Sequence, residues 1–220
     1  MEPSFDKITR SKLYEIGSVL WDIVALSLIW LIFSIPIITS GASSAALYFA
    51  LYKRVKKESD AAIPDFMRSF KSNIRQSIPL SLLYTIFAVI IVINIHIARF
   101  GLNGIMLPAW YLPFAILIIV PFVILYPFAY PYLARFSTDT KHIIMNSAAI
   151  SSMNFGKAFL LFIISFVSIT LMVLFPPCVL IVPFVASYLR VMVAEKIFEA
   201  AIEQEKHRTE ASEDEEGEAE

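Results

Sequence analysis

Charged side chains are missing from four long stretches of this sequence, residues 23–52, 76–98, 100–134 and 158–189. A helix of about 20 apolar residues is long enough to cross the hydrocarbon core of a bilayer. Hydrophobic residues make up 58% of the 220-residue chain and charged residues only 17%, whereas about a quarter of a soluble domain is charged. The sequence therefore predicts an all-α protein, a polytopic bundle of transmembrane helices.

Six spans fit these stretches, and they differ in length. The predicted spans cover residues 16–38, 41–52, 78–98, 109–133, 158–175 and 178–194. The second is short and rich in Ala and Ser, so it either crosses the bilayer or forms a deep re-entrant hairpin. The last two form a hairpin that turns at Pro176 and Pro177. Pro inside the other spans is compatible with membrane helices, because neighbouring helices, hydroxyls or water satisfy the freed carbonyls.

Positive charge is distributed unevenly around these spans. Every one of the 18 Lys and Arg residues except Arg99 falls on one side of the six-span arrangement. Because Lys and Arg in short loops resist translocation, this distribution predicts that both termini are cytoplasmic. The asymmetry would collapse if the short second segment stayed on one side, so we expect that segment to enter the membrane.

The first span ends in the stretch SIPIITSGASSAALY, which breaks the apolar run. Pro36 removes a backbone donor, and Thr39 or Ser40 can satisfy a loosened carbonyl or cap the next helix. We expect Gly41 to allow a backbone geometry that other residues resist, and Ala42 begins a thin helix face suited to close packing. The break is interpreted either as a tight turn into a closely packed helix or as a bent ligand site like those of transporters.

The connector after the second predicted span contains the segment PDFMRSFKSNIRQS. Phe66, Phe70 and Ile74 recur every four residues while basic and polar residues take the other faces, which is the pattern of an amphipathic helix. Such a helix can lie on the cytoplasmic surface and bind anionic lipid headgroups. The alternative is a plain connector whose positive charge only sets the topology. The connector between the fourth and fifth spans is also expected to be helical.

Residues 203–220 differ from the rest of the chain, because they are rich in Asp and Glu and almost free of apolar residues. Such a segment cannot bury enough surface to fold. We therefore expect two parts, an integral membrane helical domain over residues 1–202 and an acidic, disordered cytoplasmic tail over residues 203–220. The tail could alternatively dock on a basic partner.

The sequence holds no catalytic or cofactor-binding motif. The three histidines are far apart, and the single Cys178 excludes an internal disulfide and a thiolate cluster. We expect no enzymatic activity, no cofactor, no metal site and no nucleic-acid partner. Asp22 is the one acid inside a predicted span, and we expect it to pair with Arg190 or a loop Lys rather than to relay protons. Arg190 is expected to extend to the cytoplasmic interface.

Two short elements and one residue pair carry a resemblance to a known family. The elements are Pro-x-x-Thr-x-Gly-Ala after the first span and Asp-Phe-x-x-Ser-Phe-Lys-x-Asn in the first connector, and an Arg-Phe pair follows the fourth span. The residues that form them are Pro36, Thr39, Gly41, Ala42, Asp65, Phe66, Ser69, Phe70, Lys71, Asn73, Arg135 and Phe136. In these elements the chain resembles the YesL-like bacterial membrane proteins, a family of unknown function. It departs from them at Ser27, Ser40 and Ser137, where members often carry Asn, an aliphatic residue and Asp.

The resemblance extends over about residues 13–200 and implies a multi-pass protein of the bacterial cell membrane. Members are often encoded beside sugar-uptake transporters, which implies an accessory role in carbohydrate import. The expected function is therefore that of a non-enzymatic interaction protein in the lipid bilayer. Its partners would be the permease subunits of a sugar transporter or further copies of itself. The alternative is a small transporter or channel that acts alone or as an oligomer.

Overall fold

The computed structural model describes residues 4–101, 108, 111–136 and 138–217, and in these residues the chain is helical with no strand. This confirms the all-α prediction. The elements are α1 (Ser4–Ser34), η1 (Ile37–Thr39), α2 (Ser40–Val55), α3 (Ala62–Phe100), α4 (Tyr111–Arg135), α5 (Thr140–Met153), α6 (Phe155–Leu174), η2 (Pro176–Leu180) and α7 (Val182–Gly217).

The bundle is built around α2, a helix of 16 residues. It packs against α1, α3, α4 and α7, and residues on almost every side of it are buried, from Gly41 to Tyr52. The small side chains of its first two turns allow these neighbours to approach closely. At 1.5 Å per residue α2 is about 24 Å long, somewhat short of the roughly 30 Å hydrocarbon core.

The longest helix of the bundle core is α3, which has 39 residues and continues through Pro79. The sequence predicts a separate amphipathic connector followed by a span, and in this respect the prediction is wrong. The two are one helix, about 58 Å long and about twice as long as a bilayer core is thick. Phe66 and Phe70 are buried and contact Phe33 of α1, with the Phe33 and Phe70 ring centroids 4.6 Å apart. They therefore pack inside the protein, and the face opposite to them carries the exposed basic residues.

The second half of the chain adds three helices and the C-terminal helix. Pro121, Pro127 and Pro131 lie inside α4, which packs against α2, α3, α5 and α6. The predicted hairpin between the last two spans is present, since α6 and α7 pack together and are joined by the short helix η2, which begins at Pro176. The second connector is helical, as predicted, and forms α5.

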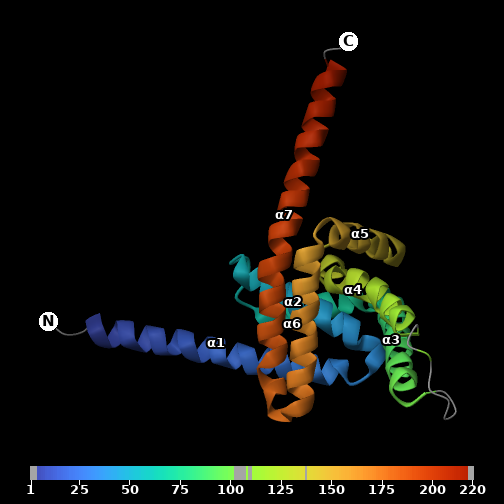
Figure 1. The fold of residues 1–220 in the computed structure, drawn as a ribbon. Coiled ribbons are helices and arrows are strands. Elements are labelled where there is room, and N and C mark those ends of the chain that lie inside the picture. The colour runs from blue at the N-terminus through green and yellow to red at the C-terminus, as the bar shows by residue number, and fades with distance from the viewer. Residues whose placement is uncertain (1–3, 102–107, 109–110, 137, 218–220) are drawn as a thin grey trace.

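Both terminal helices extend away from the bundle (Figure 1). α1 reaches out to one side, and the last part of α7 projects from one end. The prediction of a disordered tail over residues 203–220 differs from the structure, because α7 remains helical to Gly217. Ala, Glu and Lys are strong helix formers, so the helix can continue past its last packing contact without a hydrophobic core around it. Residues 218–220 lie outside the described residues.

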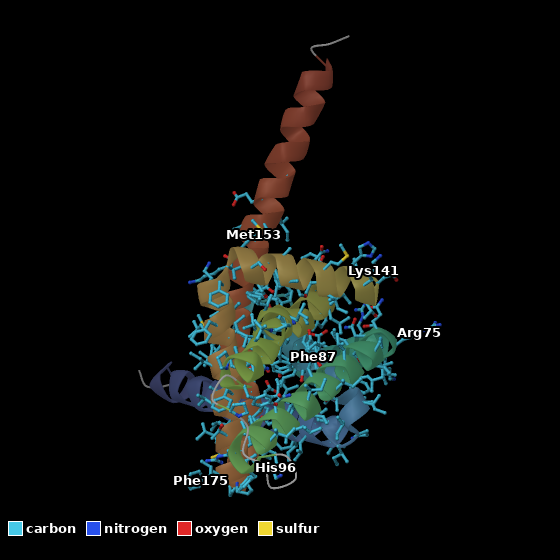
Figure 2. The ribbon with its side chains drawn as sticks, turned by 45° about the vertical axis from the view of Figure 1, so that its right-hand side comes forward. Arg75, Phe87, His96, Lys141, Met153 and Phe175 are labelled. Carbon is cyan, nitrogen blue, oxygen red and sulfur yellow. The ribbon has the colours of Figure 1, made fainter. Side chains whose placement is uncertain are left out.

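Two of the described helices, α3 and α6, are long and apolar enough to cross a membrane. Their outward faces carry exposed large hydrophobic side chains, among them Leu82, Ile86 and Val89 on α3 and Ile163 and Phe166 on α6. Figure 2 places His96 of α3 and Phe175 after α6 toward one end of the bundle, and Lys141 and Met153 of α5 toward the other.

Candidate functional site

The break at the end of the first predicted span is a tight turn. α1 stops at Ser34, and α2 starts at Ser40 after the single turn η1. The Thr39 hydroxyl donates to the carbonyls of Phe33, at 2.7 Å, and Pro36, at 2.9 Å. The Ser40 hydroxyl likewise donates to the carbonyl of Ile37. Both side chains therefore satisfy carbonyls loosened by the turn, and neither caps α2, which has no side-chain cap.

Gly41 is needed for space and not for its backbone angles. It lies in the first turn of α2, and among the described glycines only Gly101 has a positive φ. A Cβ at Gly41 would lie 2.2 Å from Ser81 Oγ and 2.6 Å from Tyr130 Cε1. The Gly41 amide also donates to Ser81 Oγ at 3.1 Å. The expectation of an unusual backbone geometry at Gly41 is therefore wrong, whereas the expectation of close packing from Gly41 and the fully buried Ala42 agrees with the structure.

Hydroxyl groups recur every four residues along α2, at Ser40, Ser44, Tyr48 and Tyr52. This spacing places them on one face of a helix. Ser40, Ser44 and Tyr48 line spaces that are shared with α4, α6 and α7, and Tyr52 lies against Arg135 of α4. The interior of the bundle thus holds a continuous polar face, which we call the α2 hydroxyl face.

A buried ionic cluster closes one end of this face. Tyr48 donates to Glu195 Oε1 of α7 at 2.7 Å, and Arg135 Nε lies 3.3 Å from Glu195 Oε2. The Arg135 guanidinium also covers the Tyr52 ring at 4.1 Å from its centroid, and Tyr52 donates to Glu58. Glu195 is only 5% exposed. It directly follows the last predicted span; burial raises the pKa of its carboxyl, and Tyr48 and Arg135 oppose that effect.

The other end of the α2 hydroxyl face borders a cavity of about 190 Å³. Its wall includes Trp30 of α1, Tyr126 of α4, Ser168 of α6 and Ser187 and Arg190 of α7. The Arg190 guanidinium donates to Ser165 Oγ at 3.1 Å, midway along α6. The guanidinium thus turns toward a hydroxyl inside the bundle, and its predicted extension to the cytoplasmic interface stays a prediction.

Three further ion pairs join the helices outside the α2 hydroxyl face. Arg54 pairs with Asp22, and Lys56 pairs with Glu199. The expected partners of Asp22 were Arg190 or a loop Lys, and the structure supplies Arg54 at the end of α2 instead. Lys53 Nζ lies 3.5 Å from Asp65 Oδ1. These pairs tie α2 to α1, α3 and α7.

The remaining predicted site residues on α3 form a buried packing surface. Asp65, Phe66, Phe70 and Asn73 are all at most 8% exposed. Asn73 donates to Ser69 Oγ at 3.1 Å one turn earlier, and Asp65 makes the ion pair with Lys53. This set anchors α3 to the centre of the bundle, and it lies apart from the cavity beside Arg190.

Glu195 and the cavity were not predicted, although the sequence holds a signal for both. Glu195 is the first acid after the long uncharged stretch, and Arg190 is the first charge after it. The four-residue spacing of hydroxyls on α2 was also visible. Among the described residues, no group of three or more His, Cys, Asp or Glu side chains comes together to hold a metal ion. The chemistry offered by the site is hydrogen bonding and charge, which suits binding.

Comparisons with known proteins identify one part of the chain. No curated protein and no solved structure matches the chain. The family model described as "Protein of unknown function, DUF624" matches residues 23–95. This range runs from the second half of α1 through α2 and most of α3, so it includes the turn at Pro36, Gly41 and the packing surface of α3. YesL-like proteins carry the same region, and the match therefore confirms that the chain resembles this family of unknown function over residues 23–95.

Proposed function

We propose that the protein is a multi-pass protein of the bacterial cell membrane with no enzymatic activity, and that it acts as an accessory partner of a carbohydrate-uptake transport system. The observation that carries this proposal is the division between a polar interior, in which Glu195 is held by Tyr48 and Arg135, and an apolar exterior on α3 and α6. Phe159, Ile163, Phe166 and Val173 on α6 are all exposed. Such faces suit lipid and other membrane helices.

The arrangement of the labelled ends of α3, α5 and α6 supports a six-span topology. Figure 2 places His96 and Phe175 toward one end and Lys141 and Met153 toward the other. In a six-span topology the first end is extracellular and carries few charges, and the second is cytoplasmic and carries the basic connectors. Because α3 is about twice as long as the bilayer core is thick, its basic first half would extend into the cytoplasm. Both termini then lie on the cytoplasmic side.

The closed end of the interior argues against a conduit formed by one chain alone. Between Arg190 and Tyr48 the remaining space is only about 10 Å³, which is the room of about one water molecule. Beyond it, Glu195 is held by Tyr48 and Arg135. Removing one partner from a buried ion pair is destabilising by about 3–5 kcal/mol. A passage through this end would have to separate these groups, which favours a binding or assembly role.

The accessory role in sugar uptake follows from the resemblance to the YesL-like family, and isolation from native membranes tests it. The tagged full-length protein, solubilised in mild detergent, should carry permease subunits of a transport system in a fixed ratio. A tagged multi-pass protein of similar abundance serves as the control and should carry none. Recovery of the protein alone, or only with further copies of itself, would contradict the accessory role.

A small transporter is the second candidate, and the cavity beside Arg190 is the observation that favours it. A lone Arg at the centre of a membrane helix is unfavourable by about 2.5–3.5 kcal/mol on insertion scales, and such groups often mark substrate pathways. Proteoliposomes that contain only this protein decide between the two candidates. We expect no solute flux above that of empty liposomes. Flux that is lost in Arg190→Met would establish the transporter instead.

A further inference from the structure

Arg190 has an unbalanced charge within the described part of the chain. Its guanidinium carries five N–H donors, and among the described residues it makes one hydrogen bond, to Ser165, and no ion pair. Glu195, the nearest acid along α7, is already held by Tyr48 and Arg135. Arg190 is partly buried, and its guanidinium has no counter-charge among the described residues. A charge withdrawn from water is costly unless it is paired, so the guanidinium favours an anionic partner.

The cavity beside Arg190 supplies both room and further donors. It extends from residues near the ends of their helices, Ser40, Met172 and Pro183, to Arg190 at its inner limit. The Tyr126 and Ser187 hydroxyls line it, and neither makes a hydrogen bond to another described residue. The volume of about 190 Å³ far exceeds the roughly 10–15 Å³ that one water molecule requires.

We infer that this cavity is a binding site for one anionic group, a carboxylate or a phosphate, held by Arg190 and the surrounding hydroxyls. A guanidinium presents paired N–H donors that match the two oxygens of such a group. Ser187 and Tyr126 then donate to the oxygen atoms that Arg190 leaves free. The small space between Arg190 and Tyr48 ends the site on its inner side.

Two sources can supply the anion, a free solute or the headgroup of an anionic lipid. Both meet the same donors, so the chemistry of the site is common to them. A free solute binds in a bilayer of neutral lipid, whereas a lipid headgroup requires an anionic bilayer. The anion site goes beyond the accessory role proposed above. Because binding is measured on the isolated protein, failure of the anion-site inference can be distinguished from failure of the co-purification test.

The test uses the full-length protein in nanodiscs of neutral phosphatidylcholine, at constant ionic strength. Inorganic phosphate and acetate are the probes, and acetamide is the neutral isostere of acetate. Thermal unfolding should shift upward by roughly 5–10 °C at a hundred times the dissociation constant of a probe. Acetamide should cause no shift. Arg190→Met should weaken binding at least about tenfold, and Arg75→Met, at an exposed position of α3, should leave it unchanged.

A second arm tests the lipid source. In nanodiscs that contain phosphatidylglycerol, native mass spectrometry should show a retained anionic lipid that Arg190→Met loses, if the headgroup is the occupant. Ser187→Ala keeps the charge and should weaken binding of the probe or lipid by a smaller factor, so it tests the site even if Arg190→Met fails to fold. The inference is overturned if neither probe nor lipid binds, if acetamide binds as well as acetate, or if binding survives both substitutions.

Discussion

Tyr48 of α2 and Glu195 of α7 are 147 positions apart in the sequence and are joined by a 2.7 Å hydrogen bond from the Tyr48 hydroxyl to Oε1. Both residues are at most 5% exposed. The contact connects the central helix to the C-terminal helix, and Arg135 of α4 completes it from the other side. Three helices that are distant in the chain thus meet at one carboxylate.

The first prediction concerns Tyr48→Phe, which keeps the ring and removes only the hydroxyl. Glu195 Oε1 would lose its donor inside the bundle, and leaving a buried acceptor without a partner is destabilising by about 1–3 kcal/mol. We expect the free energy of unfolding, measured by denaturant titration in detergent micelles, to fall by that amount. Tyr188→Phe is the control, because Tyr188 is 39% exposed, and it should have little effect. Equal stabilities for the two variants would contradict the importance of this bond.

The second prediction concerns Gly41→Ala. The added Cβ would overlap Ser81 Oγ and Tyr130 Cε1, and overpacking of this kind is typically destabilising by about 1–3 kcal/mol. Gly156→Ala is the matched control, since nothing lies within 4 Å of a Cβ at that position. Both glycines lie in helices, so only the packing differs between the two variants. The thermal midpoint of Gly41→Ala should fall while that of Gly156→Ala is unchanged or rises, and the reverse order would refute the close-packing explanation.

The third prediction concerns the ion pair between Asp22 of α1 and Arg54 of α2. Their side chains are 17% and 25% exposed, so solvent screens part of the attraction and the coupling should be about 1 kcal/mol or less. A double-mutant cycle of Asp22→Asn and Arg54→Met measures it as the part of the destabilisation that does not add. The pair Asp22→Asn and Arg75→Met should be additive. If the destabilisations of Asp22→Asn and Arg54→Met simply add, the contact between the two side chains contributes nothing to stability.

Local signals in the sequence were sufficient for the turn between α1 and α2. Pro36 lies beside small and hydroxyl residues that favour a turn, and Thr39 and Ser40 donate to carbonyls within six residues of themselves. The continuity of α3 was harder to predict. The length of an apolar run indicates where a membrane span begins, but it does not indicate where the helix begins. Pro79 at the start of the apolar run suggests a helix boundary, yet it lies inside α3.

The interior contacts depend on partners that no local pattern names. From its position alone, Arg190 could reach outward along the helix or inward to Ser165, and the packing of α6 against α7 decides between them. Glu195 is followed by Lys196 and resembles a solvated helix end. Only the approach of Tyr48 and Arg135 from two other helices makes it a buried group. The sequence therefore marks the residues of the candidate site, but it does not show which of them meet, whereas the helical class could be predicted.

The six-crossing topology, on which the proposed function depends, is tested most directly by cysteine accessibility. Cys178, the single cysteine of the chain, is partly exposed in η2 between α6 and α7. Asp60 is exposed between α2 and α3. A membrane-impermeant maleimide should label Cys178 in intact cells. It should label Asp60→Cys, made in a Cys178→Ser background, only after the cells are permeabilised. Labelling of both positions from the same side of the membrane would contradict the account.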